Sequence, residues 1–484
     1  MGTHIPEVTQ WDTFELALEG PGTGNPFTDI ELFGEFRQGN RHLRVRGFYD
    51  GDGIYRIRFM PPATGQWGYR IISTAPRLDR QEGLFECVNP GDGNHGPVAA
   101  DNHSSLRYHD GTPFFALGTT SYGWVHQDPA LVTQTLGTLD TAPFTKMRMC
   151  ALPKRYEYVD QEPPLYPFEP GQGDAQWDFS RFNPAYFRNL EQRIMQLRDR
   201  GIQADLILFH PYDCGHWGFD RMGAETDDRF VRYLIARVGA CRNVWWSMAN
   251  EPQYVKSKTA KDWDRLFALV RAEDPYGHLC SIHGGYDFGA DVITHVCGTR
   301  SPAESIEQFR AFGKPVVYDE HGYEGDVPYG WGNVNPRELV HQSWLAAASG
   351  AYPCAHSECF WNPELVLWWS RGGEVRGESV PRLAFLRDIM EQAPLGRLQP
   401  FDDAIPGNSQ ARVRDEHTGY LLAYTGSAQP RFYRAKLPES GHYAAEVIDT
   451  WAMTVEKVAD DLSGTVDIAL PARPYVLVRV TEAN

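Results

Sequence analysis

Two hydrophobic runs of the chain end on carboxylates that could carry out acid–base and nucleophilic chemistry. The run VWWSMAN ends at Asn250 and Glu251, and Pro252 follows, whereas the run PVVY ends at Asp319 and Glu320 before a loop that contains glycine. Cleavage of a glycosidic bond with retention needs one carboxylic acid that protonates the leaving oxygen and one carboxylate that attacks the anomeric carbon. We therefore predict glycoside hydrolysis, with Glu251 as the acid/base and Glu320 as the nucleophile.

The pattern of hydrophobic and amphipathic segments predicts the strands and helices that would position these two residues. From about residue 107, hydrophobic runs alternate with amphipathic segments of helical period, which is typical of a parallel sheet. The expected strands cover 113–124, 144–154, 201–213, 243–252, 278–285, 291–298, 314–322 and 351–361. The expected helices cover 183–201, 227–240, 260–275, 301–313, 335–350 and 380–392. Eight strands predict a (β/α)₈ barrel, with Glu251 and Glu320 facing each other from strands four and seven.

Both ends of the chain are predicted to be β domains, so the expected fold is multidomain. Residues 1–98 alternate apolar and polar residues at period two and contain the hairpin signal DGDG at 50–53. The same alternation returns over 399–484. We expect an N-terminal β-sandwich, a catalytic barrel over 99–398 and a C-terminal β-sandwich.

The composition of the chain limits which binding partners and which cellular compartment are expected. The net charge of −17 disfavours nucleic acid and anionic membrane surfaces as partners. An oligosaccharide or glycoside substrate is expected, and a homo-oligomer is a further expectation. Eight dispersed cysteines without a CxxC pair favour reduced thiols. Together with the absence of a signal-like apolar stretch, this predicts a cytoplasmic protein.

The two strand-end motifs resemble those of the clan A retaining glycoside hydrolases, over about residues 110–395. The resemblance implies that Asn250 contacts the sugar 2-hydroxyl, that Arg148 supports the nucleophile and that Trp361 forms a platform for the sugar. It also implies an equatorial-type bond, as in a β-D-pyranoside or an α-L-arabinofuranosyl or apiofuranosyl analogue. The clan's tyrosine at the end of strand six is not evident in this chain, where His295 stands instead.

The three-part layout is similar to that of bacterial glycosidases whose barrels are related to apiosidases and endoglucanase-like proteins. In that group a His and a Glu often occur in strand eight, which implies a substrate role for His356 and Glu358. Further polar or aromatic strand-end residues could bind sugar or make structural hydrogen bonds. They are Tyr122, Trp124, His210, Asp213 and His283, of which His210 and Trp124 are included in the predicted binding site.

Other readings of the same residues remain open. A transglycosylase would use the same two glutamates, and a non-catalytic carbohydrate-binding or scaffold protein would use neither. Hydrolysis of short oligosaccharides, in an exo mode, is the leading hypothesis. The histidines lack HExxH or paired-cysteine spacing, so we expect no metal ion and no cofactor.

Overall fold

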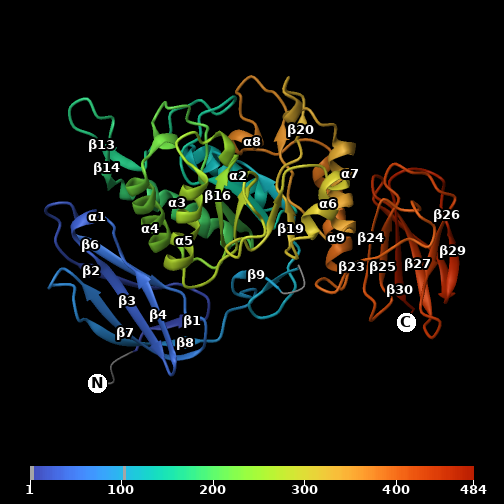
Figure 1. Ribbon diagram of the computed structural model, residues 1–484, viewed down its shortest axis with the longest axis horizontal. Helices are drawn as coiled ribbons and strands as arrows, with labels where there is room; N and C mark the ends of the chain where they lie inside the picture. The colour runs from blue at the N-terminus through green and yellow to red at the C-terminus, as the bar shows by residue number, and fades with distance from the viewer. Residues whose placement is uncertain (1–4, 102–104, 484) are drawn as a thin grey trace.

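The chain folds into three consecutive parts (Figure 1), and the computed structural model describes residues 5–101 and 105–483. An N-terminal β domain and a C-terminal β domain lie on opposite sides of a central α/β domain (Figure 1). Residues 89–97 form a loop without helix or strand between the first and second parts. The predicted boundaries after residues 98 and 398 stay predictions.

The N-terminal domain consists of two sheets that enclose a common apolar core. One sheet has the order β1 (Glu7–Thr9), β8 (Glu82–Val88), β7 (Gly65–Ser73), β3 (Leu32–Gln38) and β4 (Arg41–Arg46). The other has the order β2 (Phe14–Glu19), β6 (Ile54–Phe59) and β5 (Phe48–Tyr49), and a short helix, α1 (Pro26–Asp29), follows β2. Phe36, Phe59 and Trp67 are completely buried between them. The predicted hairpin at 50–53 is confirmed, because the amide of Asp50 donates to the carbonyl of Ile54 at 2.8 Å.

The central domain contains eight parallel strands in chain order, each inside one of the eight expected segments. They are β11 (Gly118–Thr120), β12 (Lys146–Cys150), β15 (Gln203–Phe209), β16 (Val244–Asn250), β17 (Cys280–His283), β18 (Val296–Gly298), β19 (Val316–Tyr318) and β21 (Tyr352–Pro353). A parallel bridge between Thr119 and His356 joins the eighth segment back to the first. The amide of Thr294 donates to the carbonyl of Cys280, which links the fifth and sixth segments. These two contacts join the five-stranded sheet of β11 to β17 and the three-stranded sheet of β18, β19 and β21 at both edges, so the eight strands are arranged in a ring.

Helices cover the outside of this ring and face the two flanking domains. They are α2 (Pro129–Leu139), α3 (Pro184–Arg198), α4 (Ala224–Val238), α5 (Ala260–Glu273), α6 (Pro302–Arg310), α7 (Pro336–Ala348) and α9 (Ser379–Glu391). Figure 1 shows α3, α4 and α5 on the side of the N-terminal domain and α6, α7 and α9 on the side of the C-terminal domain. No described helix lies between β17 and β18, as predicted from the short YDFGA interval.

Shorter elements lie in the loops between strands and helices of the central domain. They are β9 (Val98–Ala100), β10 (Leu106–Tyr108), η1 (Trp124–His126), β13 (Phe168–Pro170), β14 (Trp177–Phe182), η2 (Phe219–Arg221), η3 (Pro252–Tyr254), β20 (Glu324–Gly325), η4 (Gly330–Gly332), β22 (Glu358–Cys359) and α8 (Trp368–Arg371).

The C-terminal domain also has two sheets around an apolar core. The larger one has the order β23 (Gln399–Pro400), β24 (Ala411–Arg414), β25 (Leu421–Tyr424), β30 (Val476–Glu482), β27 (Tyr443–Asp449) and β28 (Thr454–Leu462). The smaller one pairs β26 (Phe432–Lys436) with β29 (Thr465–Ala469). His341 of α7 lies 3.0 Å from the phenol oxygen of Tyr424, which connects this domain to the central one.

Charged side chains connect the N-terminal domain to the central one. Asp50, at the start of the hairpin, accepts hydrogen bonds from Arg188 of α3 at 3.1 Å and from Arg237 of α4 at 2.8 Å. Arg237 is fully buried and also pairs with Glu191 of α3. Because an unpaired buried charge is costly, these contacts fix the N-terminal domain against the helices.

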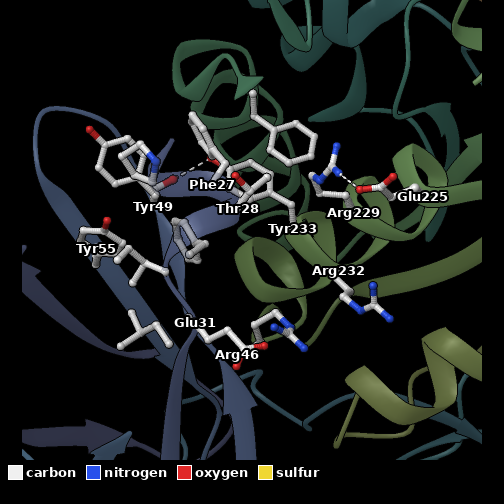
Figure 2. A pocket seen from close by; sticks show the side chains of 16 residues that line it. Phe27, Thr28, Glu31, Arg46, Tyr49, Tyr55, Glu225, Arg229, Arg232 and Tyr233 are labelled. Carbon is white, nitrogen blue, oxygen red and sulfur yellow. Dashed lines mark hydrogen bonds and ion pairs between the residues drawn. The ribbon is translucent and has the colours of Figure 1, made fainter. Parts of the chain in front are cut away.

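A cavity of about 320 Å³ opens at the same junction, between α1 and α4 (Figure 2). Its cations have acidic partners, since Arg46 and Arg232 contact Glu273. Arg229 contacts Glu225, as Figure 2 shows. These arginines therefore have no unmet need for an anionic ligand.

All eight cysteines are free thiols, and only Cys214 is exposed. Among the helices of the described residues, none has the length and apolar character needed to cross a bilayer. Residues 5–101 and 105–483 contain no cluster of three or more His, Cys, Asp or Glu side chains arranged to hold a metal ion.

Candidate active site

Glu251 follows the fully buried strand β16 in an unusual backbone conformation. Its φ and ψ angles are 46° and 57°, in the left-handed region that non-glycine residues seldom occupy, and Pro252 begins η3 directly after it. Such strain is kept mainly where function requires it. Burial, and next the negative charge of Glu320, raises the pKa of Glu251 above its ordinary value. The phenol of Tyr212 donates a hydrogen bond to Glu251 Oε2.

Glu320 lies two residues after β19 and is surrounded by donors. His283 Nε2 is 3.2 Å from Glu320 Oε2, the phenol of Tyr122 donates to the same oxygen at 3.3 Å, and Arg148 Nη1 is 3.9 Å away. Burial by itself would raise the pKa of this carboxyl. The hydrogen bond and charge of His283, followed by the charges of Arg148 and Lys154, outweigh burial and lower the pKa to about 2.

Asn250 and Arg148 connect the surroundings of the two glutamates. Arg148, fully buried on β12, donates through Nη2 to Asn250 Oδ1 and through Nη1 to the Tyr122 phenol at 3.3 Å. Asn250 Nδ2 in turn donates to the phenol of Tyr212 at 2.8 Å. Each phenol thus accepts one hydrogen bond from this pair and donates one to a glutamate. The chain of bonds fixes both carboxyl groups from the same side of the strand ring.

Lys154, just past β12, is a buried cation among aromatic rings. Its Nζ lies 3.6 Å from the ring centroid of Tyr122 and 4.2 Å from those of Tyr212 and Trp369, and its residue exposure is 3%. Burial lowers the pKa of this amine to about 8, although the nearby Cys150, Glu320 and Glu251 act in the opposite direction. We call Tyr122, Tyr212 and Trp369 the aromatic cage.

A second buried lysine lies next to the strand end that carries Glu320. Lys146 of β12 pairs with Asp319 at 2.8 Å and with Asp205 of β15. All three side chains are almost completely buried. The charges of Lys146 and Arg148 outweigh burial and hold the pKa of Asp319 below its usual range. This ion cluster fixes the end of β19 and thereby the position of Glu320.

Three residues predicted to bind substrate lie in the packed interior. Trp124 is fully buried, with its indole nitrogen 3.2 Å from Met149 Sδ. His295 packs against Trp245, and His356 stacks on Phe144 while its Nδ1 contacts Thr119 Oγ1. None of the three is brought to the two glutamates, because their strand segments turn these side chains toward neighbouring elements. The position expected for His295 beside the nucleophile is occupied instead by His283.

The remaining predicted residues differ in their relation to the site. Asn250 and Arg148 lie at its centre, as predicted. His210 Nδ1 accepts a hydrogen bond from the backbone of Tyr212, so it holds the residue that contacts Glu251. Glu358 is buried and accepts from the amide of Phe360, which ties it to its own loop, and burial raises its pKa to about 7. Trp361 is 56% exposed on the same loop, and its contact with sugar stays a prediction.

Sequence reasoning missed three residues of the site: Lys154, Tyr212 and Trp369. Tyr212 occurs in HPYD and Lys154 in ALPK, each at the carboxyl end of an expected strand. For Tyr212 and Lys154, this position at a strand end was the signal available in the sequence. A cleft of about 660 Å³ opens beside them, lined in part by Tyr156, whose ring lies 5.4 Å from that of Tyr212.

Parallel strands with two glutamates of opposite pKa shift at their carboxyl ends define a glycoside hydrolase-like enzyme. Residues 100–357 match the model of the apiosidase-like catalytic domain, and the chain belongs to this family. Residues 7–74 match one domain of unknown function (DUF5060) and residues 410–481 match another (DUF5605).

Solved structures agree with this assignment. A putative glycoside hydrolase from Bacteroides vulgatus is 38% identical, with a TM-score of 0.92 over 99% of this chain and 100% of that one. A glycoside hydrolase of family 5 from the same organism is 15% identical, with a TM-score of 0.62 over 81% of this chain and 93% of the other. The second likeness is one of fold alone. No protein among the curated sequences matches the chain.

Proposed function

We propose that the protein is a retaining glycoside hydrolase that works by double displacement, with Glu251 as acid/base and Glu320 as nucleophile. The observation that carries this proposal is the opposite shift of the two pKa values within one site. A raised pKa favours the protonated form of Glu251, which is the form that a general acid requires. A pKa of about 2 keeps Glu320 ionised and able to attack an anomeric carbon.

The same arrangement supports the second half of the reaction. When Glu320 forms the glycosyl ester, its negative charge disappears, and that charge is one cause of the raised pKa of Glu251. The pKa of Glu251 then falls, so its carboxylate can remove a proton from the incoming water. Arg148 and Tyr122 contact the nucleophile throughout, and Tyr212 orients the acid/base.

The fold we propose for this enzyme is a (β/α)₈ barrel between an N-terminal Ig-like sandwich and a C-terminal sandwich. Eight parallel strands in chain order and two-sheet packing in each flanking domain support it. Exo action on short oligosaccharides is part of the proposal and rests on the sequence expectation. The hydrogen bonds that connect Arg148, Asn250 and Tyr212 to Glu251 favour catalysis over a non-catalytic scaffold.

A nucleophile variant with azide rescue tests the mechanism directly. Glu320→Gly should lose activity on aryl glycosides and regain it with azide, and NMR should show a glycosyl azide of inverted configuration. The wild type should release a sugar of retained configuration. A wild-type product of inverted configuration, or full activity of Glu320→Gly without azide, would overturn the proposal. Added sugar acceptors distinguish transglycosylation, because they would appear in the product.

A further inference from the structure

Lys154 is a cation without an acidic partner at the centre of the site. No hydrogen bond or ion pair within 4 Å joins its ammonium group to any residue of 5–101 or 105–483. An ammonium group has three N–H donors and no acceptor. Burial of such a group is costly unless an anion or several acceptors compensate. The need for an acceptor at Nζ is therefore unmet by the protein itself.

The aromatic cage holds this ammonium without neutralising it. Ring faces attract a cation electrostatically, yet they carry no net charge and accept hydrogen bonds only weakly. Glu320, whose charge raises the pKa of Lys154 more than that of Glu251 does, already accepts from Tyr122 and contacts His283 and Arg148. The indole N–H of Trp369, one of the cage rings, is also buried without an acceptor among the described residues.

Three other buried cations among the described residues differ from Lys154 in having carboxylate partners. Lys146 pairs with two aspartates, Lys258 pairs with Asp227 at 2.7 Å, and Arg237 pairs with two carboxylates. Each of these three cations is paired with at least one carboxylate of the protein. Lys154 has none, and it lies where substrate must bind rather than in a packed interface.

Substrate would lie next to this ammonium group. Tyr122 donates to one glutamate and Tyr212 to the other, and both rings face Lys154 Nζ. A sugar whose anomeric carbon lies between the two carboxyl groups must therefore border Nζ.

We propose that Lys154 binds a carboxylate carried by the sugar whose bond is cleaved, so that the enzyme acts on uronosides rather than on neutral glycosides. This inference rests on the proposed glycosidase function and names its substrate class. A carboxylate in place of a hydroxymethyl group changes the charge of a sugar with little change in its size. It would supply both the missing counter-ion and the missing acceptors.

Matched substrate pairs test the inference by kinetics. We would measure kcat/KM for 4-nitrophenyl β-D-glucuronide against the β-D-glucoside, and for the β-D-galacturonide against the β-D-galactoside. The wild type should prefer a uronide by at least about tenfold, as expected for a charge-assisted hydrogen bond. Lys154→Met should abolish the preference, Lys154→Arg should keep part of it, and Lys256→Met, which changes an exposed lysine, should keep all of it. A preference for neutral sugars, or a ratio unchanged in Lys154→Met, would overturn the inference.

Binding measurements separate this inference from the proposed reaction. Glucuronate, galacturonate, glucose and galactose would be titrated into wild-type protein and into Lys154→Met, with thermal melting as a check of folding. Tighter binding of a uronate that disappears in Lys154→Met supports the inference even if no glycoside is hydrolysed. Hydrolysis of neutral glycosides without any preference for uronates leaves the proposed function standing and overturns the inference. Failure of both uronates to bind overturns it whatever the activity.

Discussion

Tyr122 and Tyr212 occupy matching positions beside the two glutamates. The phenol of Tyr122 donates to Glu320 and that of Tyr212 to Glu251, while both rings face the ammonium group of Lys154. The protonation states of the two carboxyl groups are therefore set within one connected group of side chains. A change at any member should alter the pH dependence of the reaction as well as its rate.

Glu251→Gln should slow cleavage most for substrates with poor leaving groups, because protonation of the leaving oxygen is lost. We expect a decrease in kcat/KM of about 10² to 10⁴-fold for alkyl glycosides and a much smaller one for 2,4-dinitrophenyl glycosides. Steady-state kinetics on both substrate types checks this. Glu364→Gln, a change of an exposed loop residue, should have no effect. Equal losses for both leaving groups would contradict the role of Glu251.

His283→Ala should move the acid limb of the pH profile to higher pH. The hydrogen bond and charge of His283 help lower the pKa of Glu320 from the ordinary 4.5 to about 2. Without them only the charges of Arg148 and Lys154 oppose burial, so the pKa rises and Glu320 becomes protonated at a pH where the wild-type carboxylate is still ionised. Profiles of kcat/KM between pH 3 and 7 report the pKa of the free enzyme. His417→Asn, in the C-terminal domain, serves as control, and an unshifted acid limb in His283→Ala would count against the assignment.

The preference for uronides should weaken as the pH rises through about 8, where Lys154 loses its proton. The groups that face this amine are Tyr122, Tyr156, Tyr212, Trp369, Cys150, Arg148, Glu251 and Glu320. We would measure kcat/KM for the uronide and for the neutral glycoside from pH 6 to 9.5. The ratio of the two values isolates the effect of Lys154 ionisation, since protonation of Glu251 affects both substrates. A ratio that is constant over this range would contradict the role of Lys154.

The two buried lysines should respond in opposite directions to replacement by methionine. The pKa of Lys154, lowered from 10.5 to about 8, corresponds to a cost of roughly 3 kcal/mol for burying its charge. Lys154→Met should therefore raise the melting temperature at pH 7, and this gain should vanish above about pH 10, where the unfolded chain also loses the proton. Lys146→Met leaves Asp205 and Asp319 buried without a cation and should destabilise the protein by roughly 3 to 5 kcal/mol.

Thermal melts of both variants beside Lys256→Met check these signs. A lower melting temperature for Lys154→Met at pH 7 would show that the cage stabilises the ammonium group more than burial costs. Active sites commonly sacrifice stability in this way, because groups arranged for a ligand are left unsatisfied without it.

The strands were predictable from sequence because each one is a hydrophobic run that ends at a turn signal. The positions of Glu251 and Glu320 after β16 and β19 were predictable for the same reason, and their catalytic roles stay a proposal. Helix α2 was missed, because its several threonines weaken the helical pattern. Its available signal was the pair Asp128 and Pro129, a capping residue followed by a proline at the first helical position.

Side-chain direction could not be predicted in the same way. His283 ends β17, whereas His295 comes directly before β18, at the amino end of that strand. Only His283 reaches Glu320, because the two glutamates lie at the carboxyl ends of the strands. Lys154 was missed because a lysine at a strand end is ordinarily a solvated residue. Only the three rings that converge on it, from the segments after β11 and β15 and from α8, make it a buried cation.

The contact between Asp50 and Arg237 also bears on how this architecture is inherited. A carboxylate of the N-terminal domain neutralises a fully buried guanidinium group of the catalytic domain. A recombined gene that joined this central domain to a foreign N-terminal domain would encode a chain whose Arg237 has lost one of its two counter-ions. The N-terminal domain is accordingly not an interchangeable module, and the two domains are expected to be transmitted, expressed and engineered as a single unit.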